Sequence, residues 1–316
     1  MEFLVTVIIP VYNGEKFIER SLDSVLYHSE VTEVLVINDG STDGTEHILD
    51  HYSSCNSRVE ILCHAQKINK GRSASRNLGL QRASGPYIAF LDADDFFLPN
   101  RFIFDKEIFF ANKEADGVYN AIGVHFYRDF VEEEEEALNC YMVTEELPSD
   151  SLFKELLIGR KGHFSIDGLT LKKSVLENVG YFNECLPVAE DTEFMWRIAL
   201  NHSLVTGSLK EIVAKRGVHE SNIFDNESAY KDRLLEVCEE LLLWVGKNNA
   251  HKEKIDILLK TLWNYRYRHT TTISQHIKHW GKQFLTSYKL LFTMHSIKYF
   301  PLVRRRKELF SFLYKR

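Results

Sequence analysis

The segment Asp92-Ala93-Asp94-Asp95 holds the side chains best suited to bind a divalent cation that also holds phosphate oxygens. It directly follows an apolar run, residues 87–91, that predicts a buried strand. Side chains two apart along a strand share a side, so its first and third aspartates are expected to converge on one ligand. Clustered carboxylates repel unless a cation compensates them, and hard oxygen ligands suit Mg²⁺ or Mn²⁺. The alternative is helix capping, in which Asp95 or Asn100 starts the following helix.

Two earlier segments place polar residues after predicted strands. Residues 3–9 predict a first buried strand that Pro10 breaks, and residues 33–37 predict a second one that ends at Asn38 and Asp39. Ligands of open α/β sheets gather beyond the carboxyl ends of the strands, where an acidic residue can accept hydrogen bonds from a ribose or base. Asp39 therefore predicts a nucleotide contact. Asp43, with Glu46 three residues later, predicts only a capping box.

A basic segment, residues 69–77, brings Gly71, Arg72 and Arg76 to the start of a predicted helix. A helix N-terminus and guanidinium groups both favour anionic oxygen, and glycine allows close backbone approach. Arginines four residues apart lie near one helix face. Each arginine could contact the ligand, or one could hold Asp92 in place.

Together, these segments resemble family-2 glycosyltransferases with a GT-A fold, of the bacterial polysaccharide or glycan-biosynthesis type. The similar segments span roughly residues 3 to 222 and include Pro10-Val11-Tyr12-Asn13, Asp39-Gly40-Ser41-Thr42-Asp43-Gly44, Asn69-Lys70-Gly71, Ser75-Arg76-Asn77 and Asp92-Ala93-Asp94-Asp95. The resemblance implies inverting sugar transfer from a nucleotide diphosphate donor, most commonly a UDP-sugar, helped by Mn²⁺ or Mg²⁺. The resemblance and the patterns above together assign ten residues to the binding of the nucleotide-sugar: Pro10, Tyr12, Asn13, Asp39, Gly71, Arg72, Arg76, Asp92, Ala93 and Asp94.

The candidate catalytic base lies in residues 188–197, which resemble the family's acidic pair followed by a Trp-Arg helix. There the aspartate deprotonates the acceptor hydroxyl, so the resemblance assigns this role to Asp191 and acceptor contact or support to Glu190. An alcohol that attacks an anomeric carbon must lose its proton, and a positioned carboxylate contributes ~10² to 10⁴ in rate. The alternative is that Asp191 only caps the helix that runs to Leu200.

A second metal ligand is suggested by residues 215–222, which resemble the element closing the catalytic domain in many relatives. There the histidine meets the metal or the diphosphate, and His219 beside Asp94 would make a sensible metal set. The alternative is a polar surface histidine, since the chain has 13 histidines. Residues 162–163 and 166–168 fall in the variable middle, where acceptor recognition resides in this family, and identify no acceptor.

Strand and helix patterns alternate up to about residue 130, which predicts a mostly parallel central sheet flanked by helices. We therefore expect an α/β protein of the GT-A type, with a catalytic domain at 1–225 and a helical, basic C-terminal region at 226–316. The catalytic domain is expected to divide into a nucleotide-binding half, 1–115, and an acceptor-binding half, 116–225. Helices are predicted at Glu15–Tyr27, Thr45–Tyr52, Arg72–Arg82 and Asn100–Asn112, and strands near residues 3, 33, 59, 87 and 117.

The C-terminal region is predicted to contain three helices, Glu227–Trp244, Lys252–Arg268 and Gly281–His295. From Leu258 onward 13 Lys and Arg face one acid, Glu308, so this end carries +12 and the remainder carries −18 of the net −6. An aromatic stripe in the last helix with flanking lysines suits an interfacial helix on anionic lipid, or packing on the acidic domain or a second subunit. The run 132–136 of five glutamates predicts a solvated loop.

Length and composition agree with an intracellular enzyme. The chain has 316 residues, 44% of them hydrophobic, which allows one sizeable domain and an appendage. Five cysteines lack the spacing of a zinc site or disulfide scaffold, so we expect a reducing compartment. No apolar run reaches the ~18 residues of a spanning helix, and Glu2 stands where a signal peptide carries basic charge. We expect a cytoplasmic protein, peripheral on the inner face of the membrane.

The expected partners are a nucleotide-sugar donor, a glycan or lipid-linked saccharide acceptor and a second copy of the chain, but no nucleic acid, because the body is acidic. A dinucleotide-dependent oxidoreductase is excluded because no G-x-G-x-x-G follows the first strand. A nucleotidyltransferase would show a Gly- and Arg-rich loop there. The remaining alternative is a sugar-nucleotide-binding partner subunit without turnover, and the joint presence of Asp39, Asp92, Asp94, Asp191 and His219 argues against it.

Overall fold

The computed structural model divides the chain into two compact units, Met1–Asn226 and Glu227–Arg316. The structure describes all residues except 1, 140–142, 221–226, 249, 268–271 and 315–316. The division lies one residue from the boundary expected from the change in sequence pattern.

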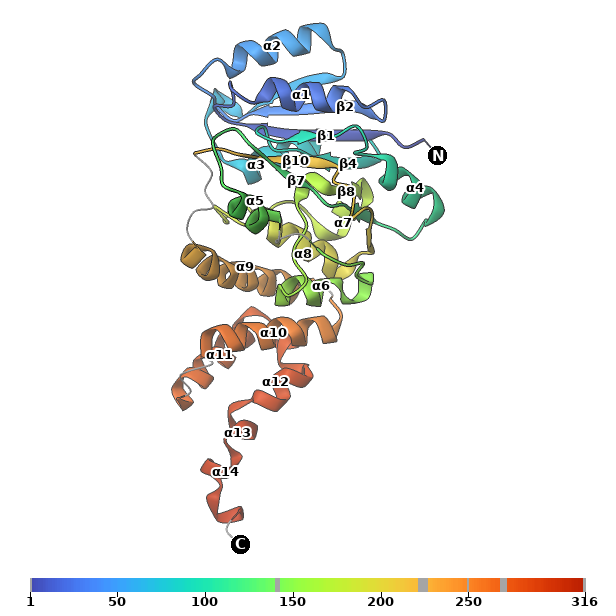
Figure 1. The fold of residues 1–316 in the computed structure, drawn as a ribbon. Coiled ribbons are helices and arrows are strands. Elements are labelled where there is room, and N and C mark those ends of the chain that lie inside the picture. The colour runs from blue at the N-terminus through green and yellow to red at the C-terminus, as the bar shows by residue number, and fades with distance from the viewer. Residues whose placement is uncertain (1, 140–142, 221–226, 249, 268–271, 315–316) are drawn as a thin grey trace. The chain divides into compact units, whose positions relative to one another are not determined.

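A seven-stranded sheet in the order β3-β2-β1-β4-β8-β6-β9 forms the centre of the first unit (Figure 1). Four of its strand pairs are parallel, and only β8 runs antiparallel to its neighbours β4 and β6. A smaller sheet has the order β5-β10-β7. The expected α/β architecture with a mostly parallel sheet is therefore confirmed. The strands are β1 (Val5–Val11), β2 (Val31–Asn38), β3 (Val59–Cys63), β4 (Tyr87–Phe90), β5 (Phe96–Phe97), β6 (Gly117–Tyr119), β7 (Gly123–Phe126), β8 (Leu169–Lys172), β9 (Leu204–Thr206) and β10 (Ala214–Val218).

The helices of this unit alternate with the strands. The α-helices are α1 (Ile18–Leu26), α2 (Thr45–Cys55), α3 (Arg72–Arg82), α4 (Ile103–Ala111), α5 (Glu132–Asn139), α6 (Ser149–Ile158), α7 (Leu176–Val179) and α8 (Glu190–Asn201), and the 3₁₀ helices are η1 (Ala65–Lys67), η2 (Ile166–Gly168) and η3 (Lys173–Val175). Helices α1 and α2 lie on the opposite side of the sheet from α3 and α8 (Figure 1).

Helices on both faces explain why every residue of β1 is buried. Val7 and Ile9 share a hydrophobic cluster with Leu22 of α1. Ile8 points the other way, toward α3, because successive side chains of a strand alternate. There a Cβ added at Gly79 would lie 2.6 Å from Ile8 Cγ2, so the missing side chain of Gly79 lets α3 approach the sheet.

The predicted helix Arg72–Arg82 is confirmed residue for residue, but three local predictions in this unit are wrong. Pro10 does not break β1: it pairs with Ile37 of β2, and the pairing of β1 with β4 has already ended at Ile8, so no partner there needs its amide. Asp43 and Glu46 form no capping box. The Asp43 carboxylate accepts hydrogen bonds from Thr45 N and Oγ1, while Glu46 pairs with Lys67.

The third wrong prediction is the acidic run at 132–136, which is not a loop but opens α5. Glutamate has a high helix propensity, and its negative charge is favourable at a helix N-terminus. These two effects outweigh the mutual repulsion of like charges in the run, which water screens.

The second unit consists of helices, but the last long helix that we predicted, Gly281–His295, is not continuous. The unit comprises α9 (Glu227–Lys247), α10 (Lys252–Tyr267), α11 (Ile273–Thr286), η4 (Tyr288–Phe292), α12 (Met294–Tyr299), α13 (Pro301–Arg304), α14 (Arg306–Leu309) and η5 (Ser311–Leu313). The predicted helix Gly281–His295 is interrupted by extended backbone at Ser287 and at Thr293, whose hydroxyl caps α12 by accepting from Ser296 N. None of the helices in the described ranges combines the length and apolarity needed to cross a bilayer.

Candidate active site

The segment 92–95 forms a turn at the carboxyl end of β4, in which Asp95 N donates to Asp92 O over 3.0 Å. The extended strand geometry from which we expected Asp92 and Asp94 to converge is absent here, because the chain has already left the strand. The turn directs the two side chains to different partners: Asp92 to Arg76 of α3, and Asp94 to His219 after β10. Even so, the two carboxylates remain close enough for the charge of Asp92 to act on Asp94.

Asp94 and His219 form a pair that could hold a divalent cation. His219 Nε2 lies 2.9 Å from Asp94 Oδ2, and both side chains are partly open to solvent. Burial and the neighbouring Asp92 raise the pKa of Asp94, while the hydrogen bond to His219 opposes that shift. The imidazole also stacks on Phe17, with ring centroids 4.8 Å apart. A carboxylate oxygen and an imidazole nitrogen are suitable ligands for Mn²⁺ or Mg²⁺ that also holds phosphate oxygens.

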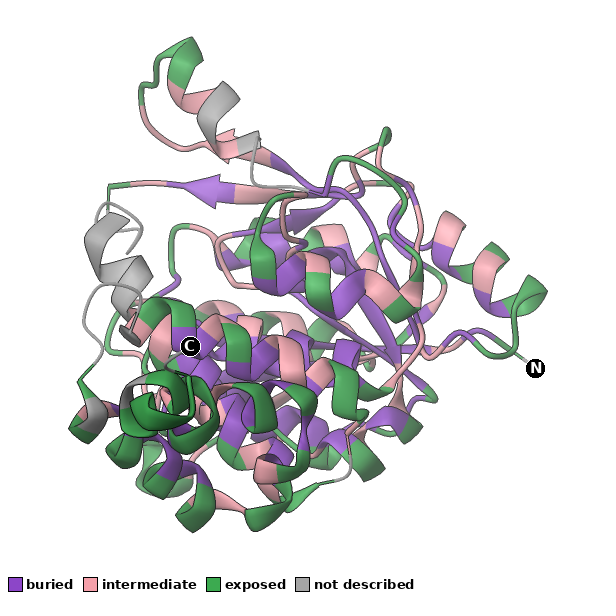
Figure 2. Ribbon diagram, turned by 90° about the horizontal axis from the view of Figure 1, so that it is seen from below, coloured by how far each residue is buried: buried purple, intermediate pink, exposed green. Residues whose placement is uncertain are grey.

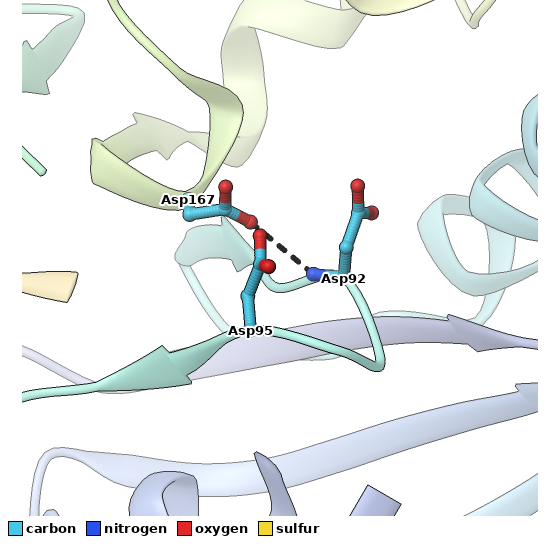
Figure 3. Close-up of side chains that lie close together, drawn as sticks. All are labelled: Asp92, Asp95 and Asp167. Carbon is cyan, nitrogen blue, oxygen red and sulfur yellow. Dashed lines mark hydrogen bonds between the residues drawn. The ribbon is translucent and has the colours of Figure 1, made fainter. Parts of the chain in front are cut away.

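A second set of carboxylates lies deeper. One oxygen of each of Asp92, Asp95 and Asp167 falls within 4.8 Å of the others, and the carboxyl groups of Asp95 and Asp167 face each other (Figure 3). Asp167 Oδ1 accepts from Asp92 N over 3.2 Å, and Asp95 Oδ1 accepts from Gly217 N over 2.7 Å. Burial raises the pKa of Asp95 well above its ordinary value, and the charge of Asp167 adds to this shift.

Asp95 and Asp167 form one buried pair whose carboxyl groups face each other. Burial and the charge of Asp92 also raise the pKa of Asp167. Both side chains are at most 3% exposed, and their oxygens already accept hydrogen bonds from the protein. The pair therefore connects the turn to η2 and β10. Compared with these two buried carboxyl groups, Asp94 is better placed to contact a cation from solvent.

Arg76 links the turn to α8. Its guanidinium is 1% exposed and donates from Nη2 to Asp92 Oδ1 over 2.6 Å and from Nη1 to Glu190 Oε1 over 2.9 Å. Although burial opposes ionisation, the charge of Arg76 lowers the pKa of Asp92. Arg72 Nε lies 3.3 Å from Glu190 Oε1, but its side chain is 42% exposed. Of the two arginines, Arg76 thus holds Asp92 in place, and Arg72 is the one open to an anionic ligand.

Replacing Arg76 with Met should destabilise the protein by about 3 kcal/mol, because it removes the counter-charge of two carboxylates at a buried position. The free energy of unfolding, measured by urea denaturation, checks this. Arg82→Met, on the same helix but with a 58% exposed side chain, should change stability by less than about 1 kcal/mol. Adding Asp92→Asn and Glu190→Gln to Arg76→Met should recover part of the loss, and no recovery would mean that packing, not charge, causes it.

The acidic pair opens α8 after an unusual backbone conformation at Ala189, whose φ of 62° lies in the left-handed region that non-glycine residues rarely adopt. Glu190 is buried against Arg76, whereas Asp191 is half-buried. Asp191 Oδ1 accepts from Thr192 N over 2.7 Å, and Oδ2 has no hydrogen bond within the described residues. One carboxylate oxygen of Asp191 is thereby fixed at the helix start, and the other is available to take a proton.

His163, from the segment 162–163 that we placed in the variable middle of the catalytic domain, lies near this candidate base. Burial lowers the pKa of His163, and the Asp191 charge acts in the opposite direction. Asp167 lies in the other segment of that variable middle, 166–168, and received no role from the sequence, because it follows no recognisable motif. Arg101 Nε holds it from behind by donating to Asp167 O over 2.9 Å. Its place opposite Asp95 is apparent only in the folded chain.

The loops after β1 and β2 are joined to each other and to α3. Asp39 is buried, and its two carboxylate oxygens accept from Lys70 N and Gly71 N over 2.7 and 2.8 Å. Asn13, with φ of 52°, accepts from Thr42 N through its side chain. Tyr12 is 52% exposed. Asp39 and Asn13 thus fix the conformation of these loops through hydrogen bonds within the protein.

The remaining predicted nucleotide residues frame the same edge of the sheet. Pro10 is buried at the end of β1, and Ala93 is partly buried in the turn. Gly71 has a φ of 87° immediately before α3, and a Cβ there would meet nothing within 4 Å. The first unit therefore brings together, at the carboxyl ends of β1, β2 and β4, the loops predicted to hold the nucleotide-sugar.

Several known proteins with similar sequences are named glycosyltransferases. The sequence profile of glycosyl transferase family 2 matches residues 6–180. Glycosyltransferase GlyA of Streptococcus pneumoniae is 40% identical over 29% of this chain and 13% of its own length. Putative teichuronic acid biosynthesis glycosyltransferase TuaG of Bacillus subtilis is 42% identical over 29% of this chain and 36% of its own. The uncharacterized glycosyltransferase RP339 of Rickettsia prowazekii is 24% identical over 81% and 80% of the two chains.

Solved structures share the fold at low sequence identity. The S. aureus TarS fragment 1–349 in complex with UDP-GlcNAc has a TM-score of 0.64 and 19% identity, covering 96% of this chain and 92% of that one. The mannosyltransferase PcManGT of Pyrobaculum calidifontis, in complex with GDP-Man and Mn²⁺, has a TM-score of 0.57 and 15% identity over 97% and 87%. The predicted GT-A fold is confirmed by these likenesses. Since the family profile covers more than half of its residues, this chain belongs to glycosyl transferase family 2.

Proposed function

We propose that this chain is a metal-dependent, inverting hexosyltransferase that moves a sugar from a nucleotide diphosphate donor to a hydroxyl of a glycan or lipid-linked saccharide. The observation that carries the proposal is the pairing of Asp94 with His219 in the same unit as Asp191. A cation ligand set and a carboxylate able to take a proton are the two parts that such a transfer requires. Membership of the family supports sugar transfer as the reaction.

In this mechanism the loops around Pro10, Tyr12 and Asp39 hold the base and ribose, and Arg72 faces the diphosphate. Asp94 and His219 would hold Mn²⁺ or Mg²⁺, which when bound neutralises charge on the diphosphate. The acceptor oxygen attacks the anomeric carbon, the bond from that carbon to the diphosphate oxygen breaks, and the nucleoside diphosphate leaves. Asp191 takes the acceptor proton. The anomeric centre inverts, so an α-linked donor gives a β-linked product.

UDP is the nucleotide that we propose, because the TarS fragment is known with UDP-GlcNAc and with UDP. PcManGT with GDP-Man makes GDP the second candidate. Since the match covers small parts of GlyA and TuaG, the donor sugar and the acceptor cannot be taken over from them. We further propose that the acceptor is presented at the inner face of the membrane.

The test is calorimetric binding of UDP, GDP and dTDP with and without Mn²⁺, followed by hydrolysis of the matching sugar nucleotides. We expect one nucleotide to bind and its affinity to rise with metal, because the cation offsets repulsion between the diphosphate and the carboxylates. Slow release of that nucleotide from its sugar conjugate should accompany binding. Binding without any turnover, even with candidate acceptors, would favour the non-catalytic partner subunit, and no binding by folded protein would contradict the proposal.

A further inference from the structure

We propose that the outward face of α11 and the residues that follow it, up to 314, form a docking surface for an anionic lipid bilayer. This surface, here called the lipid face, comprises the exposed apolar and basic side chains between residues 277 and 314. The inference deepens the proposed membrane location, but it rests only on the second unit and does not depend on sugar transfer.

Exposed apolar side chains are concentrated in this segment. Of the 26 large hydrophobic residues exposed in the described chain, 15 lie between residues 277 and 314, a stretch of 38 among 316 residues. Leu285, Met294 and Phe312 are 85%, 77% and 70% exposed. Figure 2 shows the C-terminal end coloured largely as exposed. Single exposed hydrophobic residues are ordinary, but a concentration of this kind marks an interaction site.

Helix α11 reverses the usual distribution of polar and apolar residues. Its buried face carries His276, His279 and Gln283 beside Trp280. Its exposed face carries Ile277, Phe284 and Leu285, which recur at the i, i+7, i+8 spacing of one helix face. Because the polar face of α11 packs inside its own unit, the apolar side chains on its other face make no contribution to the core of that unit. The exposed apolar stripe therefore requires another apolar partner.

Basic side chains accompany this stripe. Residues 273–314 contain eight Lys and Arg and a single acid, Glu308. Lys278 and Lys282 stand next to the stripe on α11, and Lys289 and Lys307 are exposed farther along. Part of this charge also serves the unit itself, since Lys282 lies 3.1 Å from Glu239. A segment that lies at a membrane interface has this composition. Its apolar side chains enter the headgroup region, and its cations face anionic headgroups.

The same composition argues against the other occupants. A second copy that used the same face would bring two strongly basic segments together, and like charges repel. Single-stranded nucleic acid is held by aromatic stacking, but several of the most exposed residues are aliphatic, including Leu285, Ile297, Leu302 and Leu313. Aliphatic side chains suit hydrocarbon. The favoured occupant is therefore a bilayer that contains anionic lipid.

The experiment is co-sedimentation of the full chain with vesicles of phosphatidylcholine, alone or mixed with phosphatidylglycerol, without nucleotide. We expect at least about tenfold stronger binding to the anionic vesicles, given the number of basic residues. This preference should shrink between about 0.1 M and 1 M NaCl, as the screening length falls from roughly 10 to 3 Å. Asp191→Asn should bind vesicles like the native protein, which separates this result from the fate of the transferase proposal.

Two pairs of variants test the two components of the lipid face. Leu285→Ser with Phe312→Ser should reduce binding at least about fivefold through lost apolar burial, whereas Tyr27→Ser, which removes an apolar side chain 70% exposed in the first unit, should not. Lys289→Glu with Lys307→Glu should abolish the preference for anionic vesicles. Lys154→Glu with Lys210→Glu, exposed in the first unit, changes net charge equally and should preserve that preference.

Several results would overturn the inference. One is equal sedimentation of the native protein with both vesicle types. Another is equal vesicle binding by the double variant, Leu285→Ser with Phe312→Ser, and by its control, Tyr27→Ser. If light scattering shows a dimer that the Leu285→Ser and Phe312→Ser protein loses, a second copy covers the surface. If the double variant instead unfolds at a clearly lower temperature than the native protein, and the native protein does not bind vesicles, the surface packs on the rest of the chain. Binding to oligouridine but not to vesicles would assign it to nucleic acid.

Discussion

Replacing Asp191 with Asn should lower the turnover number by about 10² to 10⁴ and leave nucleotide affinity nearly unchanged. The amide keeps the size of the side chain, and its oxygen can still accept from Thr192 N, the contact that fixes Asp191 at the start of α8. It cannot accept a proton from the acceptor hydroxyl. Transfer assays with the donor that binds, together with calorimetry of the nucleotide, measure both quantities on the same protein.

A capping role for Asp191 predicts a different result, and Asp150→Asn is the matched control. Asp150 lies in the first turn of α6, so the change removes the same charge at the N-terminus of another helix. We expect it to cost a few tenths of a kcal/mol in stability and no activity. If Asp191→Asn behaves in the same way, or if it weakens nucleotide binding as much as turnover, its assignment as the base is wrong.

Replacing Asp94 with Ala should remove most of the metal-dependent part of nucleotide binding, a loss of about 100-fold in affinity with Mn²⁺ present. Loss of groups that only support a ligand already costs 10- to 100-fold, so loss of a ligand itself belongs at the upper end. Without metal, the variant should bind nucleotide at least as well as the native protein, because one carboxylate no longer repels the diphosphate. Calorimetric titrations with and without Mn²⁺ separate these two effects.

His219→Gln should reproduce the metal-dependent loss, because His219 shares the proposed cation with Asp94. Asp129→Ala, an exposed aspartate elsewhere in the first unit, serves as the charge control and should leave both titrations unchanged. An Asp94→Ala protein that binds nucleotide with native affinity in the presence of metal would remove Asp94 from the ligand set. The buried carboxylates Asp95 and Asp167 would then be the next candidates.

The alternation of strands and helices could be predicted from the sequence alone, because that signal is local. Apolar runs bounded by glycine and polar residues placed β2, β3 and β4, and the composition of residues 72–82 placed α3 with its bounds. The order of four short motifs was enough to indicate the family. Periodicity and order along the chain need no knowledge of which elements meet in space.

Local patterns could not say which side chains meet. The pairs Asp94–His219 and Arg76–Glu190 join residues 125 and 114 positions apart, and their contacts depend on the insertion of β8 beside β4 and on the pairing of β10 with β7. Asp167 belongs to no motif and became visible only opposite Asp95. Periodicity also cannot tell which face of a helix is buried, so only the packing of α11 showed that its polar face lies inside and its apolar face outside. Tertiary structure decided these features because a side-chain contact is fixed by the sheet order and by competition among many burial partners, not by the residues on either side of it in the sequence.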